Sequence, residues 1–209
     1  MGLDMFIHRK IYGYKTKNDT ISPKIEDYSK LESGRTNRVE LSEEICYWRK
    51  ANHIHNWFVE NCQDGKDECQ EQFLTLDKIR ELRKTCMSVL QILHGHEIRV
   101  PKKFVMEYKA SRQKFNRVNT VQRILFDIDN LKEMKKLICG FHMVNKFLVS
   151  KIKKILPRKD GFFFGDTKYD GWYIDDIIDT IEMIDKLLDE DVELRKKGFY
   201  PEYYYQSSW

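Results

Sequence analysis

An apolar stripe near the C-terminus places the strongest constraint on how this chain can fold. Its members recur at intervals of three and four residues: Ile174, Ile177, Ile178, Ile181, Ile184 and Leu188. This spacing brings them to one side of a helix, so the sequence predicts a helix over about residues 171–188. Asp170 stands directly before this helix and is predicted to cap its N-terminus. Such a stripe has to be buried, which requires a packed core.

The sequence before this helix predicts further helices and one strand. Alternating residues predict a strand over 3–12, and Ser42 is predicted to cap a helix that runs to about Asn61. The remaining predictions are a helix over 76–93 and two or more helices over 102–156, with a break at 116–120 and an end at Pro157.

Two short segments near the end of the chain are predicted to be strands. The apolar run Gly161–Gly165 is bounded by glycines, and the aromatic tail 199–205 is a candidate partner for it. We expect the terminal Trp209 to be buried by the docking of this tail. The predicted fold class is α+β, a helix-rich domain with a small antiparallel sheet formed by the N-terminal, Gly161–Gly165 and C-terminal strands.

Length and composition favour a single domain over residues 1–209. The chain has 209 residues, of which 41% are hydrophobic, and this is enough to fill one core. Within this domain, residues 13–38 are polar and predict a long excursion. Residues 95–156 are predicted to form a basic helical insertion.

Several classes of protein are disfavoured. No apolar run reaches the roughly 18 residues that a membrane-spanning helix needs, and Asp4 stands where a secretory signal would carry basic residues. The five cysteines are an odd number without CxxC spacing, which is typical of free thiols in a reducing compartment. Cys62 and Cys69 with the upstream His53 and His55 match no familiar zinc motif. We expect a cytoplasmic protein without a membrane partner, a metal site or a cofactor.

Charge is distributed unevenly along the chain. Residues 102–156 contain 14 Lys and Arg against 4 Asp and Glu, whereas residues 159–209 contain 6 against 13. Two interpretations are open. The charges either form solvated faces that keep the molecule soluble, or the basic part is a surface for phosphate-bearing partners such as nucleic acid.

The predicted helix around residues 44–59 offers the strongest candidate binding residues. Helical spacing assigns one face to the core: Tyr47, Ala51, Ile54 and Phe58. A second face carries Trp48, Asn52, His55 and Val59, flanked by Arg49 and Asn56. An aromatic ring, a guanidinium, an amide and an imidazole can together stack on a base, bind a phosphate and move a proton. Alternatively, Trp48 packs under the polar excursion, and Asn52 and His55 bind its backbone. His53 and Lys50 are predicted to be ordinary surface residues.

A second unusual segment runs from Gly161 to Tyr173. Asp166, Tyr169 and Asp170 precede the last predicted helix. Asp170 is either the N-cap of that helix or a carboxylate that polarises His55 or binds a ligand hydroxyl. The chain contains no P-loop, dinucleotide fingerprint, G-x-S-x-G or H-E-x-x-H pattern, so known catalytic signatures are absent.

These segments resemble an uncharacterised family of small proteins from tailed phages and prophages. The resemblance rests on Met-Gly-Leu-Asp-Met at the start, Tyr-Trp-Arg-Lys-Ala-Asn-x-Ile-His-x-Trp-Phe-Val at 47–59, Gly-Phe-Phe-Phe-Gly at 161–165 and Tyr-Gln-Ser-Ser-Trp at the end. It covers about half of the chain. The resemblance implies a phage accessory protein in the host cytoplasm, with a role in host takeover or as a host-defence antagonist, but no particular activity.

The leading functional hypothesis is a protein that binds a nucleotide or another phosphorylated small molecule. Its predicted ligand-binding residues are Trp48, Arg49, Asn52, His55, Tyr169 and Asp170. One alternative is an enzyme in which His55 is the general acid or base and Asp170 orients it. The other is an inhibitor that binds a host protein or nucleic acid through residues 102–156.

Overall fold

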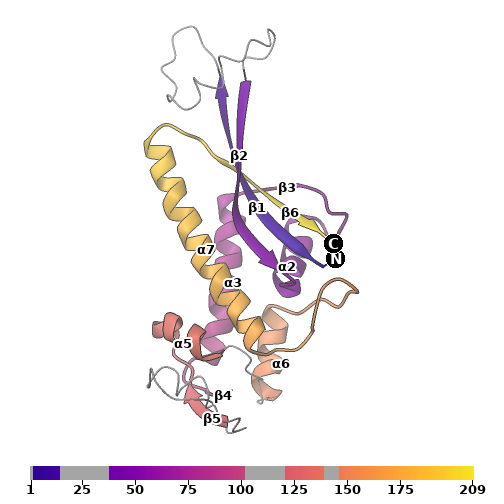
Figure 1. The fold of residues 1–209 in the computed structure, drawn as a ribbon, viewed down its shortest axis with the longest axis vertical. Helices are drawn as coiled ribbons and strands as arrows, with labels where there is room; N and C mark the ends of the chain where they lie inside the picture. Colours follow the sequence, from indigo (N-terminus) through magenta and orange to yellow (C-terminus); the bar gives the residue numbers. More distant parts are fainter. Residues whose placement is uncertain (1, 15–37, 102–120, 139–145) are drawn as a thin grey trace, which may run out of the picture.

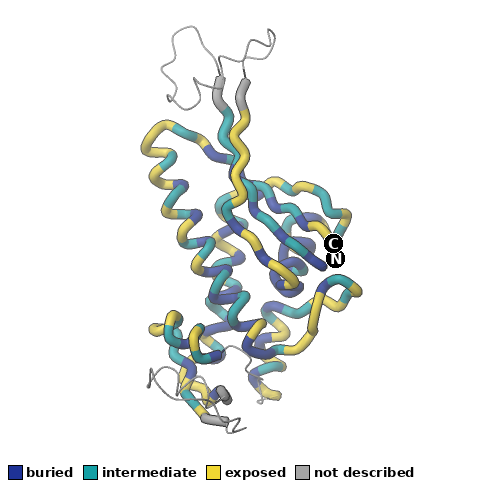
Figure 2. The backbone as a smooth tube through the Cα atoms, in the orientation of Figure 1, coloured by how far each residue is buried: buried dark blue, intermediate teal, exposed yellow. Residues whose placement is uncertain are grey.

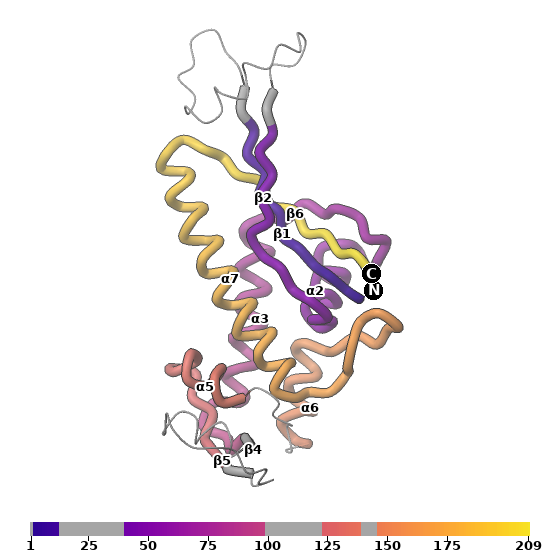
Figure 3. Tube along the Cα trace, in the orientation of Figure 1, coloured from indigo at the N-terminus to yellow at the C-terminus, as the bar shows by residue number. Residues whose placement is uncertain are grey.

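A four-stranded antiparallel sheet holds both ends of the chain together. The structure, a computed structural model, describes residues 2–14, 38–101, 121–138 and 146–209. The strand order is β2-β1-β6-β3, with bounds β1 Asp4–Tyr14, β2 Arg38–Arg49, β3 Gln72–Leu74 and β6 Glu202–Ser208. Asp4 lies opposite Ser208, so the two termini are neighbours (Figure 3).

Helices cover one face of this sheet. The side chains of Leu3, directly before β1, and of Met5 and Ile7 within it are buried, while those between them are partly exposed, as expected for a strand with one face on a core. The helices are α2 Asn52–Cys62, α3 Leu76–Leu93 and the long α7 Gly171–Lys196. In Figure 1, α3 and α7 lie side by side along the length of the molecule, and α2 lies behind the sheet.

A second group of elements packs at the far end of α3 and α7. It comprises the hairpin of β4 Glu97–Pro101 and β5 Val121–Leu125, a short 3-10 helix η1 Ile128–Asn130, α5 Leu131–Ile138 and α6 Lys146–Ile155 (Figure 1). One cluster of buried apolar side chains extends from Met5 and Tyr205 in the sheet to Met134 in α5 and Ile152 in α6. In Figure 2, dark blue buried segments recur in the sheet, in the helices packed against it and in the group of elements at the far end of α7. The predicted α+β class with N-terminal and C-terminal strands in an antiparallel sheet is confirmed.

The prediction of a helix from Ser42 to Asn61 is wrong in its first half. Residues 38–49 form strand β2, which pairs with β1 from Asp4↔Arg49 to Tyr14↔Arg38. Ser42 therefore lies within a strand and caps nothing. The chain turns at Lys50, whose φ is +60°, and the helix begins only at Asn52. Cys46 and Trp48 are buried whereas Tyr47 and Arg49 are exposed, which is the period of a strand.

The predicted strand Gly161–Gly165 is also wrong. Residues 162–164 form a turn in which Phe164 N donates to Gly161 O, and Phe162 is 95% exposed. The C-terminal strand β6 pairs with β1 and β3 instead. Gly165 has a φ of +88°, which suits glycine and ends the turn. Trp209 is partly exposed, contrary to the prediction, although its Nε1 donates to Asp67 Oδ1.

The remaining predictions had different outcomes in different parts of the chain. Helix α3 has the predicted bounds, and α7 begins at the predicted residue but extends to Lys196. In the insertion, β4 and β5 replace part of the expected helix, while the predicted break at 116–120 lies outside the described residues, as does most of the excursion 13–38. None of the described helices is long and apolar enough to cross a membrane.

Candidate functional site

Trp48 and Arg49 do not form a common site, because strand β2 turns them to opposite faces. Trp48 is buried in the core, its ring packs at an edge against Phe58, and its Nε1 donates to Thr180 Oγ1 at 2.9 Å. The Arg49 side chain is 65% exposed, and its Nε lies 3.9 Å from Asp4 Oδ1. The two were predicted to be neighbours on one helix face. Their alternation in a strand places the indole ring in the core and the guanidinium in solvent.

His55 is held between one buried partner, Tyr205, and one partly exposed partner, Asp67. Its Nε2 lies 2.8 Å from Asp67 Oδ2, and its Nδ1 lies 2.7 Å from the Tyr205 hydroxyl. Burial lowers the pKa of His55, and Asp67 only partly opposes this. The neutral imidazole fits both contacts if Nε2–H donates to Asp67 and Nδ1 accepts from Tyr205. Asp67, rather than the predicted Asp170, is therefore the carboxylate that orients His55, and both ring nitrogens are occupied.

Arg158 joins the other three predicted residues. It follows Pro157 in the irregular segment between α6 and α7. Its Nη1 lies 3.4 Å from Asn52 Oδ1, its backbone N donates to the Tyr169 hydroxyl at 2.9 Å, and its Nη2 lies 3.9 Å from Asp170 Oδ1. The structure therefore brings Asn52, Tyr169 and Asp170 together, but around a residue that the sequence analysis did not select.

The guanidinium of Arg158 is buried among two neutral oxygens and the ring of Tyr173, whose centroid is 5.2 Å away, and no carboxylate of the described residues lies closer than 3.9 Å. Its side chain is only 5% exposed. Nη1 donates to the neutral carbonyl of Asp166 at 2.9 Å, and Nε has no hydrogen-bond partner among the described residues. The carboxylate of Asp170 already accepts from the backbone N of Trp172 and of Tyr173 as the N-cap of α7. A buried cation with an open donor is costly, and an anionic ligand would relieve that cost.

The beginning of α2 adds further positive potential near Arg158. Its N-cap residue is Ala51, whose side chain cannot accept a hydrogen bond, and its first turn has no acidic residue. The side-chain amide of Asn52, the first residue of α2, donates to Phe164 O and Asp166 O and so attaches the 158–170 segment to this helix end. The backbone N–H groups of Asn52 and Ile54 already donate to Lys50 O and Ala51 O, so it is the helix dipole that favours an anion at this end.

His53 and Asp176 form a second unusual pair at the same place. His53 is fully buried, its ring packs against Tyr173 with centroids 4.4 Å apart, and neither ring nitrogen has a hydrogen-bond partner among the described residues. Its Nε2 lies 3.9 Å from Asp176 Oδ2. Burial, and then Arg158, holds the pKa of His53 well below its usual range, and burial raises the pKa of Asp176 to about 8. Near neutral pH the pair thus consists of a protonated carboxyl and a neutral imidazole.

Arg158, His53 and Asp176 were not predicted as site residues from the sequence. His53 was assigned to the surface, but α2 is covered on several sides, so Asn52, His53, Ile54 and His55 are all buried. Asp176 stands between Ile174 and Ile177 of the apolar stripe, and an acid at the border of a buried stripe was a usable signal. Arg158 offered only its place beside Pro157.

A groove of about 470 Å³ lies elsewhere, between β2 and α7. It contains none of the predicted site residues. Its lining consists of Arg9, Glu43, Glu44, Ile45, Met183, Lys186, Leu187, Asp189, Glu190, Glu193, Leu194 and Lys197. Arg9 already binds Glu43 and Glu190, at 2.6 and 2.8 Å. With five acids against three bases, this groove is unsuited to a phosphate.

Comparison with known proteins identifies no relative. No protein-family model matches the chain, and neither a curated protein nor a solved structure is significantly similar to it. Within the part of the chain that the structure describes, no three His, Cys, Asp or Glu residues are arranged to hold a metal ion. The candidate site therefore rests on its own geometry, centred on Arg158.

Proposed function

We propose that this chain binds a nucleotide or another phosphorylated small molecule and that Arg158 is the phosphate anchor. The observation that carries the proposal is the buried guanidinium of Arg158, whose Nε is open and whose nearest carboxylate is 3.9 Å away. Arg158 takes the role that the sequence analysis gave to Arg49. A planar guanidinium that is held in place suits the paired oxygens of a phosphate.

The surroundings of Arg158 support a ligand with an aromatic base. Trp172, in the first turn of α7, is exposed, and the ring of Tyr169 is partly accessible. The Tyr169 hydroxyl accepts from Arg158 N, and Trp172 stands two residues after Asp170 in the sequence. Trp48 has no part in the proposal, because its ring is in the core. In this proposal the segment 158–170, which contains only a turn, moves to admit the phosphate.

The resemblance to phage proteins supports a cellular role for such binding. We place the protein in the cytoplasm of an infected cell, where it sequesters a nucleotide signal and so antagonises host defence. Sequestration requires that the nucleotide dissociates slowly. A buried guanidinium attracts a phosphate more strongly than an exposed one does, because the interior has a lower dielectric constant than water.

Acid–base catalysis on the same ligand is a second candidate function. It is favoured by the buried pair of His53 and Asp176, because burial raises the pKa of Asp176 to about 8 and so keeps a proton available for donation, while His53 stays neutral. His55 does not support an enzyme, because both of its ring nitrogens are already bonded.

Two arginine variants test the proposed site. Arg158→Lys keeps the charge but loses the planar fork, and Arg49→Lys makes the same change at an exposed position. Small molecules that co-purify with the protein are identified by mass spectrometry, and calorimetry measures binding of ATP and inorganic pyrophosphate. We expect Arg158→Lys to weaken binding by about tenfold or more, because a hydrogen bond to a charged group contributes about 1.5–3 kcal/mol. Arg49→Lys is expected to bind as the wild type does.

Three outcomes decide between the candidates. Loss of binding in Arg49→Lys but not in Arg158→Lys would move the site to the end of β2. A wild-type protein that retains no phosphorylated molecule and binds neither probe contradicts the proposal. Recovery of the added ATP or pyrophosphate unchanged would identify the protein as a binding protein. Conversion of either molecule to a product would identify it as an enzyme. Thermal unfolding of each variant checks that the fold is retained.

A further inference from the structure

Helix α6 lies within the longest basic stretch of the chain. Between residues 134 and 159 the sequence contains eight Lys and Arg and no Asp or Glu. The helix itself, Lys146–Ile155, contributes four of the lysines in ten residues. A helix that needs only solubility commonly mixes both signs of charge, because oppositely charged neighbours one turn apart stabilise it.

The fold turns these four lysines outward. Leu148 and Ile152 are buried in the common core and attach α6 to α3. The remaining face is exposed and carries Lys146, Lys151, Lys153 and Lys154. None of these ammonium groups forms an ion pair with a carboxylate of the described residues, whereas Lys135 on the neighbouring α5 pairs with Asp179 of α7. The positive charge of α6 is therefore not neutralised within the described fold.

An aromatic ring lies among these lysines. Phe147 is 61% exposed, and Lys151 Nζ lies 4.3 Å from the centroid of its ring. Much of the Phe147 ring is thus exposed beside cations that form no ion pair with a carboxylate of the described residues. The combination of cationic side chains with an accessible ring is the one that single-stranded nucleic acids require, because phosphates bind the cations and unpaired bases stack on the ring.

We propose that the face of α6 formed by Lys146, Phe147, Lys151, Lys153 and Lys154 binds single-stranded nucleic acid. The lysines contact the phosphate backbone, and Phe147 stacks on one unpaired base. A duplex is a poorer ligand, because its base faces are hidden within the stack. An anionic membrane is also a poorer ligand, because one ring gives little apolar area to insert. This inference is independent of the phosphate anchor at Arg158.

Fluorescence anisotropy with a labelled oligothymidine strand tests this inference. Binding is expected at low salt and is expected to fall steeply as salt rises, because phosphate contacts release counterions. The double variant Lys153→Gln/Lys154→Gln should lower the slope of log K against log salt by about 1.4, which is about 0.7 for each lost contact to a single strand. Phe147→Ala should weaken binding by about fivefold or more without a comparable change in that slope.

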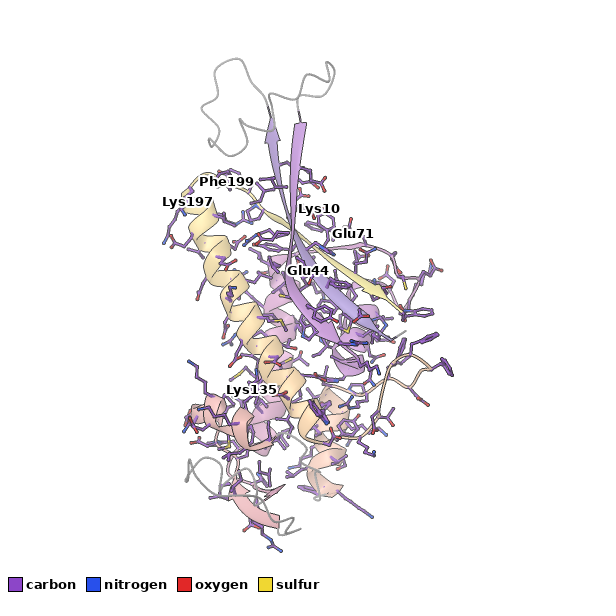
Figure 4. All side chains as sticks on the ribbon, viewed as in Figure 1. Lys10, Glu44, Glu71, Lys135, Lys197 and Phe199 are labelled. Carbon is purple, nitrogen blue, oxygen red and sulfur yellow. The ribbon has the colours of Figure 1, made fainter. Side chains whose placement is uncertain are left out.

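A control variant that loses the same charge elsewhere distinguishes a binding site on α6 from a general effect of net charge. Lys196→Gln/Lys197→Gln removes two lysines at the C-terminal end of α7, which Figure 4 places at the opposite end of the molecule from α5 and α6. We expect this control to bind oligothymidine nearly as the wild type does. Equal weakening by the two double variants, or no binding of the wild type at low salt, overturns the proposal.

Two further probes separate the alternatives. Tighter binding to a duplex of the same length, or binding to phosphatidylserine vesicles but not to oligothymidine, also overturns the assignment to single strands. Binding of ATP and pyrophosphate should be unchanged in Lys153→Gln/Lys154→Gln, since Arg158 is intact. A failure of this inference is thus distinguishable from a failure of the phosphate anchor.

Discussion

At the scale of single residues, the unusual feature of this protein is how it buries polar groups. Two hydrogen bonds join His55 to Tyr205 and to Asp67, and so link α2 with the middle of β6 and with the loop after α2. Tyr205 also stacks on Phe58, with ring centroids 3.9 Å apart. Both ring nitrogens of His55 and the hydroxyl of Tyr205 take part in these hydrogen bonds. Removing one of the groups therefore leaves a buried polar atom without its partner.

Tyr205→Phe tests the contribution of these hydrogen bonds to stability. The variant keeps the ring but removes the hydroxyl, so the buried Nδ1 of His55 loses its hydrogen bond. We expect the free energy of unfolding to fall by about 1–3 kcal/mol. Chemical denaturation measures the change, and Tyr200→Phe is the matched control because Tyr200 is exposed. The control is expected to change stability by less than about 0.5 kcal/mol. Equal stabilities for the two variants would show that the hydroxyl contributes nothing.

At the scale of elements, the N-terminal ends of α2 and α7 define the candidate site. The two ends differ in how they are capped: Asp170 caps α7, whereas the N-cap residue of α2 is Ala51, whose side chain cannot accept a hydrogen bond. Asp170 was predicted either as an N-cap or as a ligand-binding carboxylate. The structure confirms the first role and also places Asp170 Oδ1 3.9 Å from Arg158 Nη2.

Two substitutions of Asp170 separate its roles. Asp170→Ala removes the cap and should lower the free energy of unfolding by about 1–2 kcal/mol. Asp170→Asn keeps a capping oxygen, so its stability should stay close to that of the wild type. Because it also removes a negative charge beside Arg158, Asp170→Asn should bind pyrophosphate more tightly than the wild type does. Denaturant unfolding and calorimetry measure the two effects. Weaker pyrophosphate binding by a folded Asp170→Asn would mean that Asp170 contacts the ligand.

At the scale of the whole molecule, one core connects the sheet with every described helix, and titration of a group inside it affects the entire fold. Asp176 lies on α7 where this helix meets α2, and burial raises its pKa to about 8. Between the ordinary pKa of a carboxyl and this value, the folded protein holds a proton that the unfolded chain has released. Unfolding then releases this proton, so Asp176 makes the fold less stable as pH rises through about 4 to 8.

Asp176→Asn is expected to remove this pH dependence. The difference in unfolding free energy, variant minus wild type, should grow with pH by up to about 1.4 kcal/mol per unit in that window. Part of the side chain remains in contact with solvent, so the observed slope should fall short of this limit. Denaturant unfolding at about pH 5 and about pH 8 measures the difference. Asp64→Asn, at an exposed residue with a φ of +52° that Asn tolerates, is the control. A difference that does not change with pH would show that Asp176 is ionised in the folded protein.

Local patterns were sufficient to predict part of the fold. The bounds of α3, the start of α7 and its cap follow from apolar spacing and capping residues, because contacts within a helix join residues three and four positions apart. The N-terminal and C-terminal strands follow from alternation and from aromatic and β-branched residues. Asn52, Tyr169 and Asp170 were selected from the sequence, and the structure places them together.

Distant pairing decided the rest. Residues 44–49 have apolar spacing that fits a helix, but pairing with β1 makes them a strand and separates Trp48 from Arg49. The predicted strand Gly161–Gly165 became a turn because β6 is paired on both edges, with β1 and β3. Arg158 gained its importance only when the chain folded it against Asn52 and Asp170, which are 106 positions away and 12 positions away along the sequence. The sequence by itself therefore determined the helices with local periodicity and the α+β class. Only the tertiary structure decided which residues are buried together, because strand pairing and the desolvation of a charge depend on neighbours that are remote in the chain.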